Sequence, residues 1–148
     1  MSPSRTTTIL LAMCALAPLA AARANDAPVL AATIGASCAP WDGAAFVVEM
    51  PVDSLGRDLT GARLAISVWK APRIPAGTMF TFHGIADSGA VVLWSGKDSA
   101  QRLTGTVTFG AVGPDAPADG SFDLSTKGGR HLAARFHATW KKERVMCG

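Results

Sequence analysis

The 148-residue chain contains 14 Lys and Arg residues against 11 Asp and Glu residues, which gives a formal net charge of +3, and 49% of its residues are hydrophobic. Its basic cluster, Lys141, Lys142 and Arg144, is interrupted by Glu143. Nucleic-acid binding needs clustered cations that neutralise phosphates, so the charge pattern argues against a nucleic-acid partner.

The N-terminus has the pattern of a signal peptide. Arg5 supplies the positive charge, residues 9–22 form the apolar segment, and Ala22-Arg23-Ala24 matches the small-x-small pattern that signal peptidase reads. The apolar segment is too short for a transmembrane helix. We therefore predict a cleaved leader over residues 1–24 and a periplasmic or secreted location.

Two alternatives to a cleaved leader stay open. One is an uncleaved signal anchor. The other is a lipoprotein that begins at Cys14, although Met13 is larger than the residue that usually precedes a lipid-modified cysteine. Cleavage leaves about 124 residues, the size of one domain over residues 25–148, with no transmembrane span.

Removal of the leader leaves two cysteines, Cys38 and Cys147. Two cysteines in an exported chain predict a disulfide, and neither a Cys-x-x-Cys spacing nor a neighbouring histidine indicates redox or metal chemistry. The bond would close a loop of about 110 residues, for which chain entropy predicts a stabilisation of about 4 to 5 kcal/mol. We therefore predict a structural disulfide and no metal site.

The residues after Cys38, Ala39-Pro40-Trp41-Asp42-Gly43, are predicted to form a turn. Pro40 fixes its own φ, and Asp-Gly is a common turn dipeptide. Trp41 has a large apolar ring, which we expect to cover the disulfide or to close one end of the core. An exposed Trp41 in a binding site is the alternative.

Eight segments are predicted to be strands, because apolar and polar residues alternate along them or because they are short apolar runs between turn residues. They are residues 29–34, 44–50, 62–70, 78–84, 90–95, 101–110, 121–125 and 131–141. Glycine-containing turns such as Lys127-Gly128-Gly129-Arg130 are typical of tight hairpins. We predict an all-β fold, an antiparallel β-sandwich or small β-barrel of about eight strands with one disulfide; alternation does not distinguish the two.

The segment KAPRIPAG, residues 70–77, is predicted to be a stiff loop, because Ile74 stands between two prolines. A preordered loop with an apolar tip is typical of a partner contact. A loop that covers one end of the core has the same pattern.

Asp87-Ser88-Gly89-Ala90 resembles the Asp-Thr/Ser-Gly-Ala/Ser signature of aspartic proteases, in which two carboxylates share one proton. The resemblance implies that Asp87 is a catalytic acid in a homodimer, because the signature occurs once. It covers about eight residues, and the chain lacks the later apolar-apolar-Gly segment that such folds need. The sequence favours an Asp-Ser-Gly turn, and we predict no catalytic residue.

On the last predicted strand, His131, Arg135 and His137 occupy the polar face. Six residues of extended chain separate the two histidines by about 20 Å, so one metal ion cannot bind both from this strand alone. We interpret them as surface side chains. Together with Trp41 and Ile74, these three residues are the candidate binding residues.

The sequence favours a non-enzymatic binding or interaction module with no cofactor, whose partner is a protein or an envelope component. One alternative is a barrel that carries a small apolar ligand, because Gly105, Ala134 and Ala138 are small residues on the predicted inward face. A second alternative is a hydrolase centred on Asp87. The oligomeric state stays open.

Overall fold

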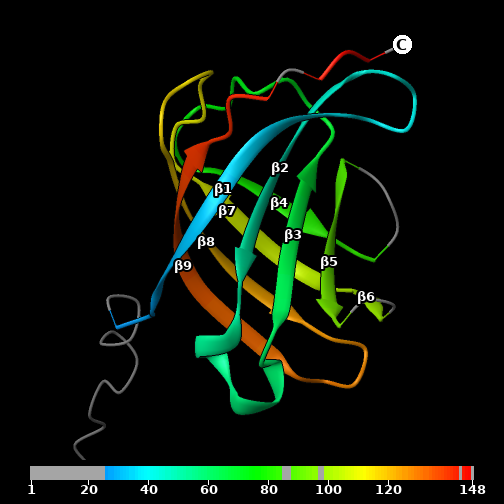
Figure 1. Ribbon diagram of the computed structural model, residues 1–148, viewed down its shortest axis with the longest axis vertical. Helices are drawn as coiled ribbons and strands as arrows, with labels where there is room; N and C mark the ends of the chain where they lie inside the picture. The colour runs from blue at the N-terminus through cyan, green and yellow to red at the C-terminus, as the bar shows by residue number, and fades with distance from the viewer. Residues whose placement is uncertain (1–25, 85–87, 97–98, 144, 148) are drawn as a thin grey trace, which may run out of the picture.

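The computed structural model describes residues 26–84, 88–96, 99–143 and 145–147. Within them the chain forms nine strands and two short 3-10 helices (Figure 1). The strands are β1 (Val29–Cys38), β2 (Ala44–Pro51), β3 (Ala62–Val68), β4 (Thr78–Phe82), β5 (Gly89–Ser95), β6 (Ala100–Arg102), β7 (Thr104–Phe109), β8 (Ala118–Ser125) and β9 (His131–Trp140). The helices η1 (Asp53–Leu55) and η2 (Arg57–Leu59) connect β2 to β3. The prediction of an all-β fold is confirmed.

The nine strands form one curled sheet, a half-barrel, in the order β4-β7-β8-β9-β1-β2-β3-β5-β6. Figure 1 shows β1, β2, β3 and β5 in front, with β7 and β8 crossing behind them. Neighbouring strands are antiparallel except for β1 and β9, which run parallel with Val29 opposite Arg135 and Ile34 opposite Trp140. The sheet is therefore mixed rather than wholly antiparallel.

The parallel pair brings the two ends of the domain together. Parallel strands end at the same edge of a sheet, so Cys38 at the end of β1 lies near the chain that follows β9. Cys38 and Cys147 form the disulfide there, with their Cα atoms 5.5 Å apart and a sequence separation of 109 residues. The predicted pairing of the cysteines is confirmed.

The segment predicted as one strand over residues 101–110 forms two strands, β6 and β7, on either side of Leu103. The Leu103 side chain is buried, and its amide nitrogen donates a hydrogen bond to the Val91 carbonyl oxygen at 2.9 Å. β6 pairs with β5, whereas β7 pairs with β4 and β8. One continuous piece of chain therefore links β6, at one end of the strand order, to β7, the second strand from the other end, and so helps to hold the sheet curled.

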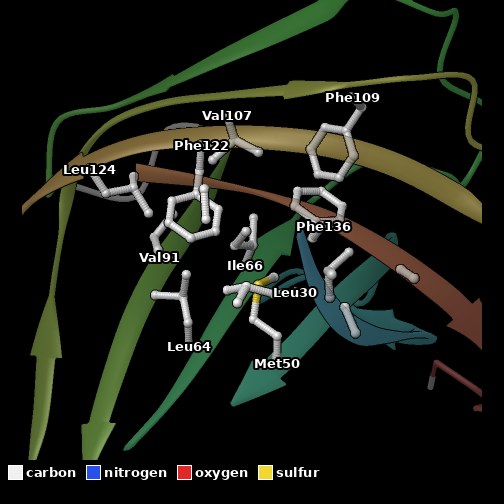
Figure 2. Packing of buried hydrophobic residues seen from close by; sticks show 14 of the residues in the cluster. Leu30, Met50, Leu64, Ile66, Val91, Val107, Phe109, Phe122, Leu124 and Phe136 are labelled. Carbon is white, nitrogen blue, oxygen red and sulfur yellow. The ribbon is translucent and has the colours of Figure 1, made fainter. Parts of the chain in front are cut away.

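The core fills the inside of the curl (Figure 2). Phe109 on β7 is at its centre, because its ring makes edge-to-face contacts with three others. The centroid distances are 5.5 Å to Phe46 on β2, 5.8 Å to Phe80 on β4 and 5.7 Å to Phe136 on β9. Such pairs add about 0.5 to 1.5 kcal/mol each beyond the area that they bury. One side chain thus ties together strands from both sides of the curl.

The small residues Gly105, Ala134 and Ala138, predicted to face inward, have close neighbours. Gly105 has φ of 133°, and the backbone of Asp123 and Leu124 lies where a side chain at Gly105 would extend. The ring of Phe136 likewise lies over Gly120 on the adjacent strand, and Ala134 and Ala138 are buried. Close backbone approach and aromatic rings therefore occupy the space beside these positions.

Candidate functional site

One end of the curled sheet gathers the disulfide and four segments that are distant in sequence (Figure 1). They are the turn 39–43, the loops 69–77 and 110–117, and the residues 141–143 and 145–147 after β9. We call this region the disulfide end. Of the five large hydrophobic side chains that the described residues expose, Trp41, Val145 and Met146 belong to it. Exposed side chains of this kind are concentrated at one end of the molecule.

Trp41 does not close an end of the core, so that expectation is wrong. Its side chain is 62% exposed, and its ring packs edge-to-face on Trp69 with the centroids 5.4 Å apart. The turn itself forms as predicted, with the amide of Ala39 bonded to the carbonyl of Gly43 at 2.8 Å. Because the turn projects beyond the sheet, the tryptophan at its tip stays accessible.

Ile74 is not an exposed loop tip. Only 7% of the residue is exposed, and its backbone pairs with Val112 through two hydrogen bonds of 3.0 and 2.9 Å. Ile74 therefore belongs to a cover over one end of the core, which is the other interpretation of the same pattern. The bridge also joins the 69–77 and 110–117 loops into one unit.

A cleft of about 700 Å³ opens at the disulfide end. Its walls come from β1, the two joined loops, the end of β9 and the residues that follow β9. The apolar and aromatic lining residues are Ala36, Pro72, Pro114, Trp140, Val145 and Met146. Asp115, Lys141, Lys142 and Glu143 supply two negative and two positive charges at the same cleft. This volume falls in the range of roughly 300 to 1,000 Å³ that ligand pockets occupy.

Trp140 lines the cleft, but the polar atom of its indole is buried. Its Nε1 atom has no hydrogen-bond partner, and within the described chain it is the one buried side-chain polar atom in that condition. A buried donor without an acceptor costs about 1 to 3 kcal/mol. Because the Nε1 atom is buried, Trp140 presents the apolar part of its ring to the cleft.

A second groove, of about 640 Å³, crosses the outer surface of β1, β2 and β3. Small side chains such as Ala31, Thr33 and Gly61 line much of it, and Glu49 at its side is bonded to Lys141 at 2.7 Å. Its described lining includes no aromatic residue and none of the exposed large hydrophobic side chains, whereas Val145 and Met146 line the cleft at the disulfide end. We therefore take the cleft at the disulfide end as the candidate site.

The polar face of β9 lies outside this cleft. His131 Nε2 is 2.6 Å from Asp123 Oδ1, and His137 Nδ1 is 2.7 Å from Asp119 Oδ1. All four side chains are more than half exposed. Arg135, between the two histidines, is exposed and also has an interaction partner. The structure does not bring these three candidates together with Trp41 or Ile74, and each histidine is engaged with its own carboxylate.

Within the described residues, no group of three or more His, Cys, Asp and Glu side chains is arranged to hold a metal ion. No helix in the same residues is long and apolar enough to cross a membrane. Asp87, the carboxylate of the protease-like motif, and the predicted leader over residues 1–24 lie outside the described residues. Gly89 of that motif begins β5.

Sequence reasoning missed the cleft because its walls come from separate parts of the chain. They are β1, the joined loops 69–77 and 110–117, the end of β9 and the chain that follows β9. One available signal was the apolar pair Val145-Met146 directly before Cys147. A cysteine that anchors the chain end also fixes its neighbours against the fold.

No protein-family model matches the chain, and neither a curated protein nor a solved structure matches it.

Proposed function

We propose that the protein is an exported, non-enzymatic interaction module that binds a protein or other envelope component at the disulfide end. The observation that carries the proposal is the cleft of about 700 Å³, which is lined by Trp140 and by the exposed side chains of Val145 and Met146. The signal-peptide pattern and the disulfide support export, because disulfides persist in oxidising compartments.

A protein partner suits the side chains around the cleft. Met146 is 93% exposed and Val145 is 46% exposed, and both belong to the cleft lining. Tryptophan and methionine are enriched in protein interfaces, and buried tryptophans are common among the residues that dominate binding energy. The balanced charges of the lining favour a partner with apolar groups and a hydrogen-bond acceptor over a strongly charged one.

The other two functional hypotheses have less support. For an internal carrier, the space beside Gly105 is taken by the backbone of β8, and Ala134 and Ala138 are buried within the packed core. For a hydrolase, the motif residue Asp87 lies outside the described residues, and the described lining of the cleft contains no histidine, serine or cysteine. The cleft is open at the surface and therefore supports binding from outside.

Export has a direct test. Protein recovered without reduction from the cell envelope or the medium is expected to have the mass of residues 25–148 less two hydrogens, because leader cleavage and disulfide formation both accompany export. Denaturing mass spectrometry measures it. An intact leader on the recovered protein, or two free thiols, would contradict the proposal.

Binding at the cleft is tested by site-specific photo-cross-linking in cells. With benzoylphenylalanine in place of Val145, we expect a discrete cross-linked partner. The matched control has the same residue in place of Ala133, which is exposed on the outer face of β9 and away from the cleft. Cross-linking that is equal at both positions would contradict a specific site.

Two further substitutions in the Val145 cross-linking chain sharpen this test. Met146→Asp places a charge on the apolar lining and is expected to abolish the cross-link. Trp140→Phe keeps an aromatic ring in the lining and removes only a buried N–H, so it is the milder change and is expected to leave the yield within about twofold. A yield unchanged by Met146→Asp would place the partner elsewhere.

A further inference from the structure

The residues that form one wall of the cleft are anchored to the fold at two points only, within the described part of the chain. At the near end, the Lys141 amide donates a hydrogen bond to the Ile34 carbonyl at 2.8 Å, and Lys141 Nζ binds Glu49 Oε2 at 2.7 Å. At the far end, Cys147 is bonded to Cys38, and its Sγ atom lies 3.7 Å from the Ser37 carbonyl oxygen.

Between these anchors the chain makes few directional contacts. We call Lys142, Glu143, Val145 and Met146 the C-terminal strap. In the described structure no hydrogen bond or ion pair connects a strap residue to the rest of the protein. All four residues are exposed, yet all four line the cleft. The strap is therefore held in place as a wall by the disulfide at its far end.

We propose that the disulfide builds the binding cleft, so that the oxidised chain has the site and the reduced chain does not. Without the bond, the described contacts tether the strap only through Lys141, and the strap gains the freedom of an unpacked segment. The sheet does not depend on the strap, because its strands are paired through β9, which ends at Trp140. Partner binding would then be confined to the oxidising compartment, and the reduced chain would not bind the partner before export.

The redox step is an ordinary thiol–disulfide exchange. Formation of the Cys38–Cys147 bond removes one proton and one electron from each thiol. The two electrons pass to the disulfide of an oxidising protein, which becomes a dithiol. In the test below, dithiothreitol reverses the step: it supplies two electrons, closes to its own cyclic disulfide and leaves two protein thiols.

The opening of the cleft is measured on the isolated chain without any partner. The four indole N–H signals are recorded by ¹H–¹⁵N spectroscopy, and the Trp140 signal is assigned with Trp140→Phe. After reduction we expect the exchange of the Trp140 indole hydrogen with water to accelerate about tenfold or more, as for a local opening. The Trp94 indole, on β5 away from the cleft, is the internal control and is expected to keep its rate.

Limited proteolysis gives a second measure of strap release. Trypsin cleavage after Lys142 is expected to accelerate about tenfold or more on reduction, because a free chain end fits a protease better than a tethered strap. Cleavage after Lys127, at the β8–β9 hairpin, is expected to stay unchanged. Equal acceleration at both sites would mean that the whole domain opens, and it would overturn a local effect of the disulfide.

A second variant keeps the proposal testable if the reduced chain unfolds. An insertion of about six Gly and Ser residues after Lys142 leaves both cysteines in place and slackens the strap. We expect this oxidised variant to unfold at the denaturant concentration of the parent and still to show fast exchange at Trp140. Slow exchange in the insertion variant, or in a reduced chain that keeps its fold, would overturn the proposal.

The claim about partner binding rests on the proposed function, and the two fail separately. Suppose that reduction frees the strap, but that benzoylphenylalanine in place of Val145 captures no partner in the oxidised protein. The cleft then depends on the disulfide, and the interaction hypothesis fails. If the Val145 cross-link persists in the slackened variant, the interaction hypothesis stands and the disulfide is not what builds the site.

Discussion

Replacing both cysteines, as Cys38→Ala/Cys147→Ala, is expected to lower the free energy of unfolding by about 4 to 5 kcal/mol. The bond closes a separation of 109 residues, so the denatured chain without it gains nearly the full loop-closure entropy. A domain of this size is stabilised by roughly 5 to 15 kcal/mol in total, so the variant stays marginally folded. Unfolding of the oxidised wild-type chain and of the cysteine-free variant in urea or guanidinium measures the difference between their free energies of unfolding.

The wild-type chain treated with dithiothreitol is the control for that experiment. It should unfold at the same denaturant concentration as the double variant, because both lack the cross-link and differ only at two small side chains. A loss below about 1 kcal/mol would mean that the denatured chain already keeps its ends together.

Phe109→Ala is expected to lower the free energy of unfolding by about 3 to 5 kcal/mol, because it leaves a cavity at the meeting point of four strands. The lost ring contacts Phe46, Phe80 and Phe136, so the void has neighbours on several sides that are themselves held in place. Thermal and chemical unfolding both report the loss.

Met79→Ala is the matched control for the core substitution. Met79 lies on β4 opposite Thr108, one residue from Phe109 in the register, but its side chain faces solvent and is 61% exposed. Its effect is expected to stay within about 0.5 kcal/mol, as for surface positions in general. If both substitutions lowered the free energy of unfolding by similar amounts, the contribution of a residue on β4 or β7 would not depend on whether its side chain faces the core or solvent.

The strands were predictable because their signal is local. In β9, Leu132, Ala134, Phe136 and Ala138 are buried while the residues between them are exposed, as alternation predicts. The hairpin at Gly128-Gly129 was predictable for the same reason, since Gly129 has φ of 83°. The disulfide followed from the number of cysteines left after the leader.

The arrangement of the strands was not predictable, because alternation does not say which strands become neighbours. The parallel pairing of β1 with β9 joins residues more than 100 positions apart, with no turn to set the register. The break at Leu103 was also hidden, because Leu103 is inward-facing in either description and only the change of partner strand divides β6 from β7.

The candidate site was only partly predictable. Trp41 was expected to cover the disulfide or to close one end of the core, but it lies at a turn tip beyond the sheet and is 62% exposed. Ile74 had two interpretations that a sequence does not separate, since the deciding contact with Val112 is nearly 40 residues away. The cleft combines β1, two loops and the chain after β9, so it exists only once the fold has formed.

The position of β1 has a consequence for the order in which this domain is completed. Among the described strands β1 is the first in sequence, and one of its two edges is paired with β9, the last. Until β9 is in place, that edge is an open row of backbone donors and acceptors on which another chain can assemble. Pairing between strands so far apart in sequence raises the contact order of the fold, which slows folding. A chaperone that shields the β1 edge would thus protect this protein during the interval when it is most prone to aggregate.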